Sequence, residues 1–400
     1  MNKKSVLLYP GLGVGHLTPM VELAKLFTQH GVAVTVALAE PPAPRPPIHA
    51  RLPQGHEHAA ARPPPLAAEL NLPVYYFYAS GASALAVFLN LPRMMATGFQ
   101  LETTGGDSVL SLPGAPPFKA SELPELILNG SQAGKAVLRV LYLFPEANGI
   151  LVNTFESLET RVVRSLSDGL CVPDRSTPPV YCIGPLVSGG GDKEHECLRW
   201  LDMQPDNSVV FLSFGSLGTF PKKQLEEMAI GLEKSGQRFL WVPLPEPDLK
   251  ALLPEGFLER TKDRGLVLKS WAPQVDVLRH RATGAFVTHC GWNSTLEGIM
   301  AGLPLLCWPL YAEQGMNKVF IVEEMKIGVE MNGYDEEMVK AEEVETKVKW
   351  VMESQGGRAL RERLAEVKDR AVKALKEGGS SHAAFVEFLK DINSMAHLHP

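Results

Sequence analysis

Residues 271–314 read WAPQVDVLRHRATGAFVTHCGWNSTLEGIMAGLPLLCWPLYAEQ, an alternation of apolar strands, polar turns and one helix. The strand at 284–289 ends at His289, and a small turn at 290–292 leads into a helix that we expect to begin near Asn293. The helix N-terminus therefore lies at the carboxyl edge of a buried parallel strand, where open α/β sheets bind ligands. Its N–H groups and the positive end of its dipole suit a phosphate.

Ser294 and Glu297 in this helix fit two interpretations on spacing alone. The pattern S-x-x-E is a capping box, in which both side chains satisfy amide groups of the helix itself. In the other interpretation the two side chains face a ligand. His289 on its own is more often a buried, hydrogen-bonded histidine than a ligand contact, and Gln314 on its own indicates nothing.

Strands and helices alternate on both sides of this stretch, which predicts two doubly wound parallel sheets facing each other. In the first half we expect strands at 4–10, 32–38, 149–155 and 179–185, with a helix at 19–30. In the second half we expect strands at 208–216, 238–242, 266–273, 284–289 and 304–309, with helices at 221–235 and 386–395. Residues 187–196 are predicted as a flexible polar linker, and the Pro-rich residues 41–65 as irregular.

Length and charge limit the class of protein. Four hundred residues exceed one hydrophobic core, so two domains are expected. The net charge is −6 and the basic residues are dispersed, which gives no support to nucleic-acid binding. The five cysteines form no C-x-x-C pair and no secretory signal precedes them, which predicts reduced thiols in the cytoplasm.

One uncharged stretch, 74–91, is long enough to be considered as a membrane span. Pro73 and Pro92 bracket it, and Ser80, Gly81 and Ser83 interrupt it. We therefore expect a buried strand at 74–78, a turn and a short helix, and no integral membrane span.

Residues 271–314 resemble the signature box of the plant secondary-metabolite UDP-glycosyltransferases of family 1. Similarity extends to GHLTPMVELAKLF (15–27), GILVNTFESLE (149–159) and SVVFLSFGSLGTF (208–220). The resemblance implies an α/β fold of the GT-B class, with two Rossmann-like doubly wound parallel-sheet domains facing across a cleft. The implied parts are an acceptor domain (1–186), a linker (187–196), a UDP-sugar domain (197–375) and a helical tail (376–400) that packs back on the first domain.

The resemblance also implies a contact with UDP-glucose, a substrate and not a resident cofactor, for each of eleven residues. These are Trp271 (stacking on uracil), Ala272 (its backbone reading the base edge), Gln274 and Glu297 (ribose), His289, Asn293, Ser294 and Ser216 (diphosphate), and Trp292, Glu313 and Gln314 (sugar hydroxyls). A glutamine at the end of the box favours glucose over galactose. An aromatic face suits a base and a helix N-terminus suits the diphosphate.

His16 ends a glycine-rich turn that follows the first strand. A dinucleotide fingerprint requires a glycine at this position, and a P-loop requires a following G-K-[S/T]. We expect Thr18 and Pro19 to be the N-cap and first residue of the next helix, with His16 in the loop before it. The resemblance implies that His16 is the general base of an inverting transfer that needs no metal, and no D-x-D pair is present to hold one.

The chain departs from the family pattern in its first half. The histidine of the family leans on an aspartate, whereas the first aspartate of this chain is Asp107. Compared with the family pattern, the first domain is thus predicted to be shortened. A second, smaller gap is predicted after the strand at 238–242, because Pro243 follows that strand directly. The protein is either truly shortened or longer than this sequence, and the intact mass of the natural protein separates the two.

Two functions follow from these observations. The first is an inverting, UDP-glucose-dependent O-glucosyltransferase that acts on a small phenolic or flavonoid acceptor and is predicted to be a monomer. The alternative is a catalytically impaired UDP-sugar-binding relative that lacks the base-orienting aspartate.

Overall fold

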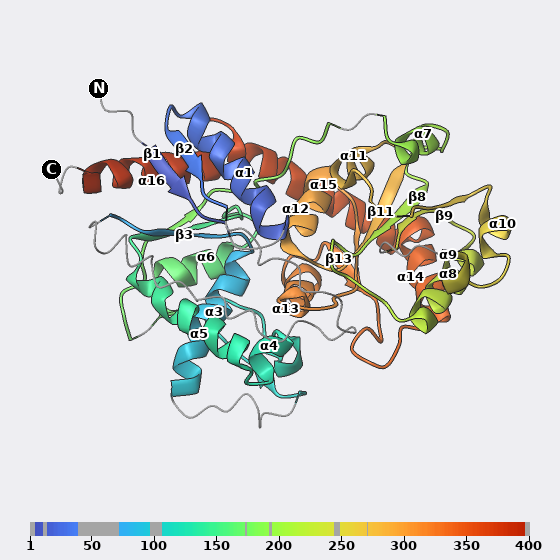
Figure 1. Cartoon of the computed structure of the whole chain (residues 1–400), viewed down its shortest axis with the longest axis horizontal. Coiled ribbons are helices and arrows are strands. Elements are labelled where there is room, and N and C mark those ends of the chain that lie inside the picture. The colour runs from blue at the N-terminus through green and yellow to red at the C-terminus, as the bar shows by residue number, and fades with distance from the viewer. Residues whose placement is uncertain are drawn as a thin grey trace, which may run out of the picture. The chain divides into compact units, whose positions relative to one another are not determined.

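The computed structural model describes eight stretches of the chain, which are residues 5–10, 14–38, 72–96, 106–172, 174–191, 194–243, 249–269 and 271–396. The chain divides into two compact units (Figure 1). The first comprises Met1–Ser188 together with Ala374–Pro400, and the second comprises Gly189–Lys373.

The second unit is built on a six-stranded sheet whose neighbouring strands are all parallel, in the order β10-β9-β8-β11-β12-β13. These strands are β8 (Val209–Ser213), β9 (Arg238–Val242), β10 (Gly265–Val267), β11 (Thr283–Thr288), β12 (Leu305–Cys307) and β13 (Gly328–Glu330). The chain runs outward from β8 through β9 and β10, then returns to the other side of β8 for β11. The order of a Rossmann sheet therefore reverses between β8 and β11, and ligands bind at such a switch point.

Helices connect these strands, as a parallel sheet requires. They are α7 (Glu196–Asp202), α8 (Lys222–Ser235), α9 (Leu249–Leu252), α10 (Phe257–Thr261), α11 (Gln274–Arg279), α12 (Trp292–Ala301), α13 (Gln314–Val319), the π-helical turn η3 (Phe320–Glu324), α14 (Ala341–Glu353) and α15 (Gln355–Leu375).

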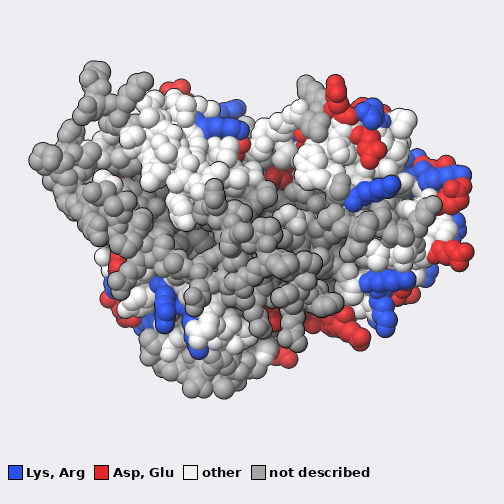
Figure 2. All heavy atoms as spheres, in the orientation of Figure 1, with Lys and Arg blue, Asp and Glu red and all other residues white. Residues whose placement is uncertain are grey.

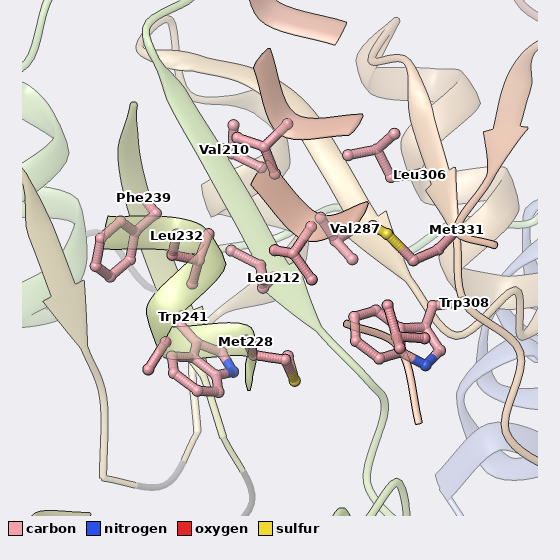
Figure 3. Close-up of a cluster of buried hydrophobic side chains, with 14 of the residues drawn as sticks. Val210, Leu212, Met228, Leu232, Phe239, Trp241, Val287, Leu306, Trp308 and Met331 are labelled. Atoms are coloured by element: carbon pink, nitrogen blue, oxygen red, sulfur yellow. The ribbon is translucent and has the colours of Figure 1, made fainter. Parts of the chain in front are cut away.

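The core of the second unit fixes the sheet on which its loops rest. Every residue of β8 and β11 is buried, which explains why both strands are nearly continuous apolar runs rather than alternating ones. Leu212, Val287 and Leu306 come from three adjacent strands and belong to one cluster, which Met228 of α8 and Trp241 of β9 also join (Figure 3). Tight packing of this kind leaves the strand ends little freedom to move.

The first unit has parallel strands too, but in the described residues they form two small sheets instead of the single sheet predicted. One pairs β1 (Ser5–Leu8) with β2 (Ala33–Val36), and the other has the order β3-β6-β7 (Tyr75–Tyr78, Gly149–Val152, Val180–Cys182). Apolar runs identify strands but not their neighbours, which explains the error. β1 is covered on one face only, since Leu8 is 7% exposed and Leu7 is 67% exposed.

The remaining elements of the first unit surround these sheets. They are α1 (Val14–Gln29), α3 (Ala82–Ala96), the antiparallel pair β4 (Val109–Leu110) and β5 (Phe118–Lys119), η1 (Ala120–Glu122), α4 (Glu125–Leu128), α5 (Gln132–Leu143), η2 (Phe144–Glu146), α6 (Thr160–Ser167) and α16 (Ser380–Ala396).

The last helix, α16, completes the core of the first unit. Phe385 and Phe388 are buried and meet Phe27 of α1 edge-on, with ring centroids 5.4 and 5.8 Å apart. Tyr181 of β7 packs on Phe388 and donates a hydrogen bond to Asp391 of the same helix. Residues close to the C-terminus thus pack against elements formed near the start of the chain.

Two helix boundaries differ from the sequence prediction, and both involve proline. α1 begins at Val14, so Pro19 lies inside the helix and not at its first position. α3 likewise continues through Pro92 to Ala96. A proline ring is compatible with the helical φ angle and removes one backbone hydrogen bond, and packing of the helix can offset that loss.

Other predictions concern the surface and the thiols. The strand at 74–78 and the following helix are present, and no helix within the described residues is long and apolar enough to cross a membrane. All five cysteines are buried thiols that form no disulfide bond within the described residues. Basic and acidic side chains are interspersed on the described part of the face drawn in Figure 2. The described residues do not include residues 41–65, Gly11, Gly13 or residues 244–248, which follow Pro243.

Candidate functional site

Several loops of the second unit converge at the carboxyl edge of its sheet. Ser213, Thr288 and Cys307 are register partners at the ends of β8, β11 and β12. The segments that follow them are the turn containing Ser216, the turn from His289 to Gly291, and the loop leading to α13. They lie side by side at the switch point, which makes this edge the candidate site.

Helix α12 starts in this site, and its first turn excludes the capping-box interpretation. The helix begins at Trp292, its N-cap is Gly291, and no side chain caps it. Ser294 and Glu297 are therefore both inside the helix. Gln274 connects them instead, because its Nε2 donates to Ser294 Oγ at 2.9 Å and to Glu297 Oε2 at 2.7 Å. Three predicted site residues are thus joined by hydrogen bonds.

Burial sets the ionisation of Glu297. Desolvation raises the pKa of its carboxyl group, and the hydrogen bond from Gln274 and the charge of Arg279 act in the opposite direction. A carboxylate in this position is a strong acceptor for two neighbouring hydroxyl groups, such as those of a ribose.

His289 is enclosed and held by glycines on two sides. A Cβ atom added to Gly215 or Gly291 would lie 2.7 or 2.5 Å from His289 Nε2, so only glycine leaves room for the ring. Gly215 also has a φ of +73°, which glycine adopts at low cost. His289 Nδ1 is buried and has no hydrogen-bond partner within the described residues. Such a group requires a partner, and a ligand at this edge can supply it.

Burial also keeps His289 neutral, because desolvation lowers the pKa of its imidazole from 6.5 to about 4. The unfolded chain therefore takes up this proton first as the pH falls. We expect the ligand-free protein to lose stability between about pH 6.5 and 4, by up to roughly 3 kcal/mol from this group. In the His289→Gln variant the free energy of unfolding should depend less steeply on pH in this window.

Denaturant titrations at a series of pH values measure this difference. His30→Gln is the matched control, since His30 is exposed at the end of α1 and its variant should keep the slope of the parent. Identical slopes for the parent and the His289→Gln variant would contradict the prediction.

Cys290 determines the shape of the turn from His289 to Gly291 by its backbone conformation, which the sequence did not predict. It has a φ of +63°, a left-handed conformation that is uncommon for residues other than glycine. Asn317 of α13 donates a hydrogen bond from Nδ2 to the Cys290 carbonyl oxygen at 3.0 Å and helps to hold the turn. No signal in the sequence connects these two residues, which are 27 positions apart.

The loop before α13 is organised by Gln314. Its Oε1 accepts hydrogen bonds from the backbone N–H groups of Leu310 and Tyr311, at 2.9 and 3.0 Å. Because the carbonyl end of the side chain is engaged in this way, Gln314 would meet a sugar with its NH2 end, as a donor. Glu313 is half-buried and is the N-cap residue of α13. The Tyr311 ring lies 6.4 Å from that of His289, which sequence reasoning also missed.

The remaining predicted residues of the second unit differ in exposure. Trp271 is 61% exposed, and its ring packs edge-on with that of His195 at a centroid distance of 5.9 Å. The Trp271 ring is therefore accessible to a nucleobase. Ala272 is buried, and Ser216 is exposed in its turn. The Trp292 side chain is buried, so only the backbone of this residue could contact a sugar.

His16 belongs to the first unit, and it lies in a helix and not in the loop that was predicted. It is an exposed residue in the first turn of α1, whereas the sequence predicted a loop ahead of the helix. The reason is the helical position of Pro19 described above.

Asn293 is half-buried in the first turn of α12. Within the described residues no group of three or more His, Cys, Asp or Glu side chains is arranged to hold a metal ion.

Comparison with known proteins gives consistent results. The family model described as "UDP-glucoronosyl and UDP-glucosyl transferase" matches residues 149–397. The anthocyanidin 5,3-O-glucosyltransferase of a Rosa hybrid cultivar is 48% identical, with 80% of this chain and 70% of the relative covered. The structure of Phytolacca americana UGT2 complexed with UDP-2fluoro-glucose and pterostilbene has a TM-score of 0.85 and 34% identity, covering 98% of this chain and 100% of that one. This likeness confirms the predicted GT-B fold class.

A third relative bears on the length of this chain. UDP-glycosyltransferase 88B1 of Stevia rebaudiana is 37% identical over 470 aligned positions, which cover 99% of this chain and all of the relative. Since this chain has 400 residues, at least 70 of those positions (470 − 400) are gaps in it. The comparisons favour an enzyme and give no support to the alternative of an impaired sugar-binding relative.

Proposed function

This chain belongs to the UDP-glycosyltransferase family and is a glycosyltransferase enzyme, and on that basis we propose that it transfers glucose from UDP-glucose to a hydroxyl group of a small phenolic or flavonoid acceptor, with inversion. The acceptor class is supported by the relatives, of which one is an anthocyanidin glucosyltransferase and another was solved with pterostilbene. We further propose that residues 197–375 bind the donor and residues 1–186 bind the acceptor.

The observation that carries this proposal is the hydrogen-bonded group of Gln274, Ser294 and Glu297, together with His289 Nδ1, which has no hydrogen-bond partner within the described residues. A UDP molecule needs an acceptor for its ribose hydroxyls and donors for its diphosphate. Glu297 is the acceptor, and His289 with the N-terminus of α12 supplies the donors. Trp271 offers the uracil an accessible aromatic face.

In the proposed reaction His16 takes the proton of the acceptor hydroxyl as its oxygen attacks the anomeric carbon of glucose. The new carbon–oxygen bond forms while the bond from that carbon to the diphosphate breaks, and UDP leaves with the bonding electrons. One displacement inverts the α-linked donor to a β-glucoside. His289 is neutral, so it stabilises the departing diphosphate as a hydrogen-bond donor.

Gln314 provides a test of the donor sugar. We expect the parent protein to use UDP-glucose faster than UDP-galactose with the same phenolic acceptor. In the Gln314→His variant the ratio should narrow or reverse, because imidazole cannot accept from both Leu310 and Tyr311 and also present an NH2 group. Initial rates with each donor measure the ratio, and the anomeric proton coupling of the product in NMR reports inversion.

Gln237→His is the matched control, since Gln237 is a half-buried residue just before β9 whose side chain donates a hydrogen bond to Glu353. This variant should keep the donor ratio of the parent. Equal rates with both donors in the parent would remove the basis for proposing glucose.

A further inference from the structure

The polar side chains of helix α11 contact two separate segments of the second unit. Gln274, its first residue, reaches Ser294 and Glu297 of α12 as described above. Asp276 and Arg279 instead contact Gly189–Gly191, the glycine segment with which the second unit begins. The same short helix therefore connects the proposed ribose contacts to the start of this unit.

The glycine segment is held closely, although the sequence predicted a flexible linker here. The backbone N–H of Gly191 donates to both carboxylate oxygens of Asp276, at 3.2 and 3.0 Å. Arg279 Nη1 donates to the Gly189 carbonyl oxygen at 2.7 Å. Gly190 has a φ of +76°, and a Cβ atom there would lie 2.4 Å from Asp276 Oδ1, so the carboxylate occupies space that only glycine leaves open.

α11 needs anchors of this kind because it is only six residues long and its N-cap residue, Pro273, makes no side-chain cap. Helices this short have little stability of their own. At its far end Thr283 donates a hydrogen bond from Oγ1 to the Val277 carbonyl oxygen at 2.6 Å. Without the bonds to the glycine segment, the helix would be less firmly held and Gln274 would lose its fixed distance to α12.

Arg279 also acts on Glu297 through its charge, since it is one of the groups that lower the pKa of that carboxyl group against the effect of burial. The guanidinium group that binds the glycine segment thereby also favours the ionised form of the proposed ribose acceptor.

We propose that Asp276 and Arg279 are positioning residues for donor binding, which by tying Gly189–Gly191 to α11 hold Gln274 where it can bond both Ser294 and Glu297. This inference rests on the proposed function, because it requires that Glu297 accept the ribose hydroxyls. It assigns the glycine segment a part in reading the ribose, in addition to joining the two units along the chain.

The test compares UDP with 2′-deoxy-UDP, which lacks one hydroxyl that Glu297 would bind. Titration calorimetry on the full chain should show that the parent prefers UDP. Asp276→Ala should weaken UDP binding about tenfold, the loss expected when a charge-assisted hydrogen bond is removed. Binding of 2′-deoxy-UDP should weaken less, so the preference shrinks. The KM for UDP-glucose should rise by a similar factor with kcat within about twofold.

Three further variants sharpen the result. Asp276→Asn retains an acceptor oxygen for Gly191 and should recover part of the affinity. Gly190→Ala should behave like Asp276→Ala, because its Cβ displaces the carboxylate. Asp369→Ala removes an exposed aspartate that pairs with Lys373 on α15, and as the matched control it should leave both affinities unchanged.

Each outcome decides a question. If Asp276→Ala does not fold, Asp276→Asn and Gly190→Ala carry the test. Equal losses for UDP and 2′-deoxy-UDP, or unchanged affinities in the folded variants, overturn the positioning role and leave the proposed function intact. A parent protein that binds neither nucleotide overturns the proposed function itself.

Discussion

We expect His16→Ala to abolish glucosyl transfer to aliphatic alcohols and to spare part of the transfer to acidic phenols. A positioned general base contributes about 10²–10⁴-fold to rate, so this is the largest effect we expect. An acidic phenol loses its proton more easily and depends less on the base. The first aspartate of this chain is Asp107, so we propose that the protonated His16 acts without the aspartate that the resemblance implies. Activity of the parent should therefore rise with pH and with the acidity of the acceptor.

Initial rates against acceptor pKa, for the parent and the His16→Ala variant, measure this effect. UDP affinity should be unchanged in the variant, because every proposed donor contact lies in the second unit. His30→Ala, directly after the C-terminal end of the same helix, is the matched control and should behave like the parent. A parent that glucosylates aliphatic alcohols at the same rate as phenols would show that another group supports His16.

Glu297→Ala should weaken UDP binding about 100-fold, the second largest effect. The variant would lose the two charge-assisted hydrogen bonds that we propose to the ribose, and it leaves Gln274 without its carboxylate partner. Titration calorimetry measures the affinity. A melting curve on the same sample separates this from a general loss of stability, and unchanged affinity would exclude Glu297 from the ribose site.

The pH dependence of Glu297 gives the same residue a second test. Burial raises the pKa of its carboxyl group, so the group takes up a proton at a higher pH than an exposed glutamate does. UDP affinity should fall as the pH falls through this pKa, because a protonated carboxyl accepts fewer hydrogen bonds. The contribution of this group to the free energy of unfolding changes in the opposite direction and acts against that of His289, since the folded state binds the Glu297 proton more tightly than the unfolded chain does. In Glu297→Gln the fall in UDP affinity should disappear, and stability should fall more steeply with decreasing pH because the opposing contribution is gone. A fall in affinity that persists in this variant would assign it to another group.

The sequence was most informative where a local pattern alone determines structure. The strand that ends just before His289 and the helix that follows could be predicted because a buried apolar run and a glycine turn are local signals. The capping box at Ser294 failed for a local reason, since the helix begins two residues earlier, at Trp292.

Features that depend on contacts between distant segments could not be predicted. The bond from Asn317 to the strained Cys290 and the anchoring of Gly191 by Asp276 both depend on tertiary packing. The division of the strands of the first unit into two sheets is of the same kind, because strand neighbours are set by the packing of the whole unit.

The position of α16 has a consequence for synthesis on the ribosome. The core of the first unit includes Phe385 and Phe388, which follow the whole second unit in the sequence. Residues 189–373 leave the ribosome before them, so the second unit can complete its core while the first still exposes Phe27 and Tyr181. The half of the protein that is synthesised first is thus finished last, and a stalled or truncated chain presents an apolar surface to the chaperones of the cell.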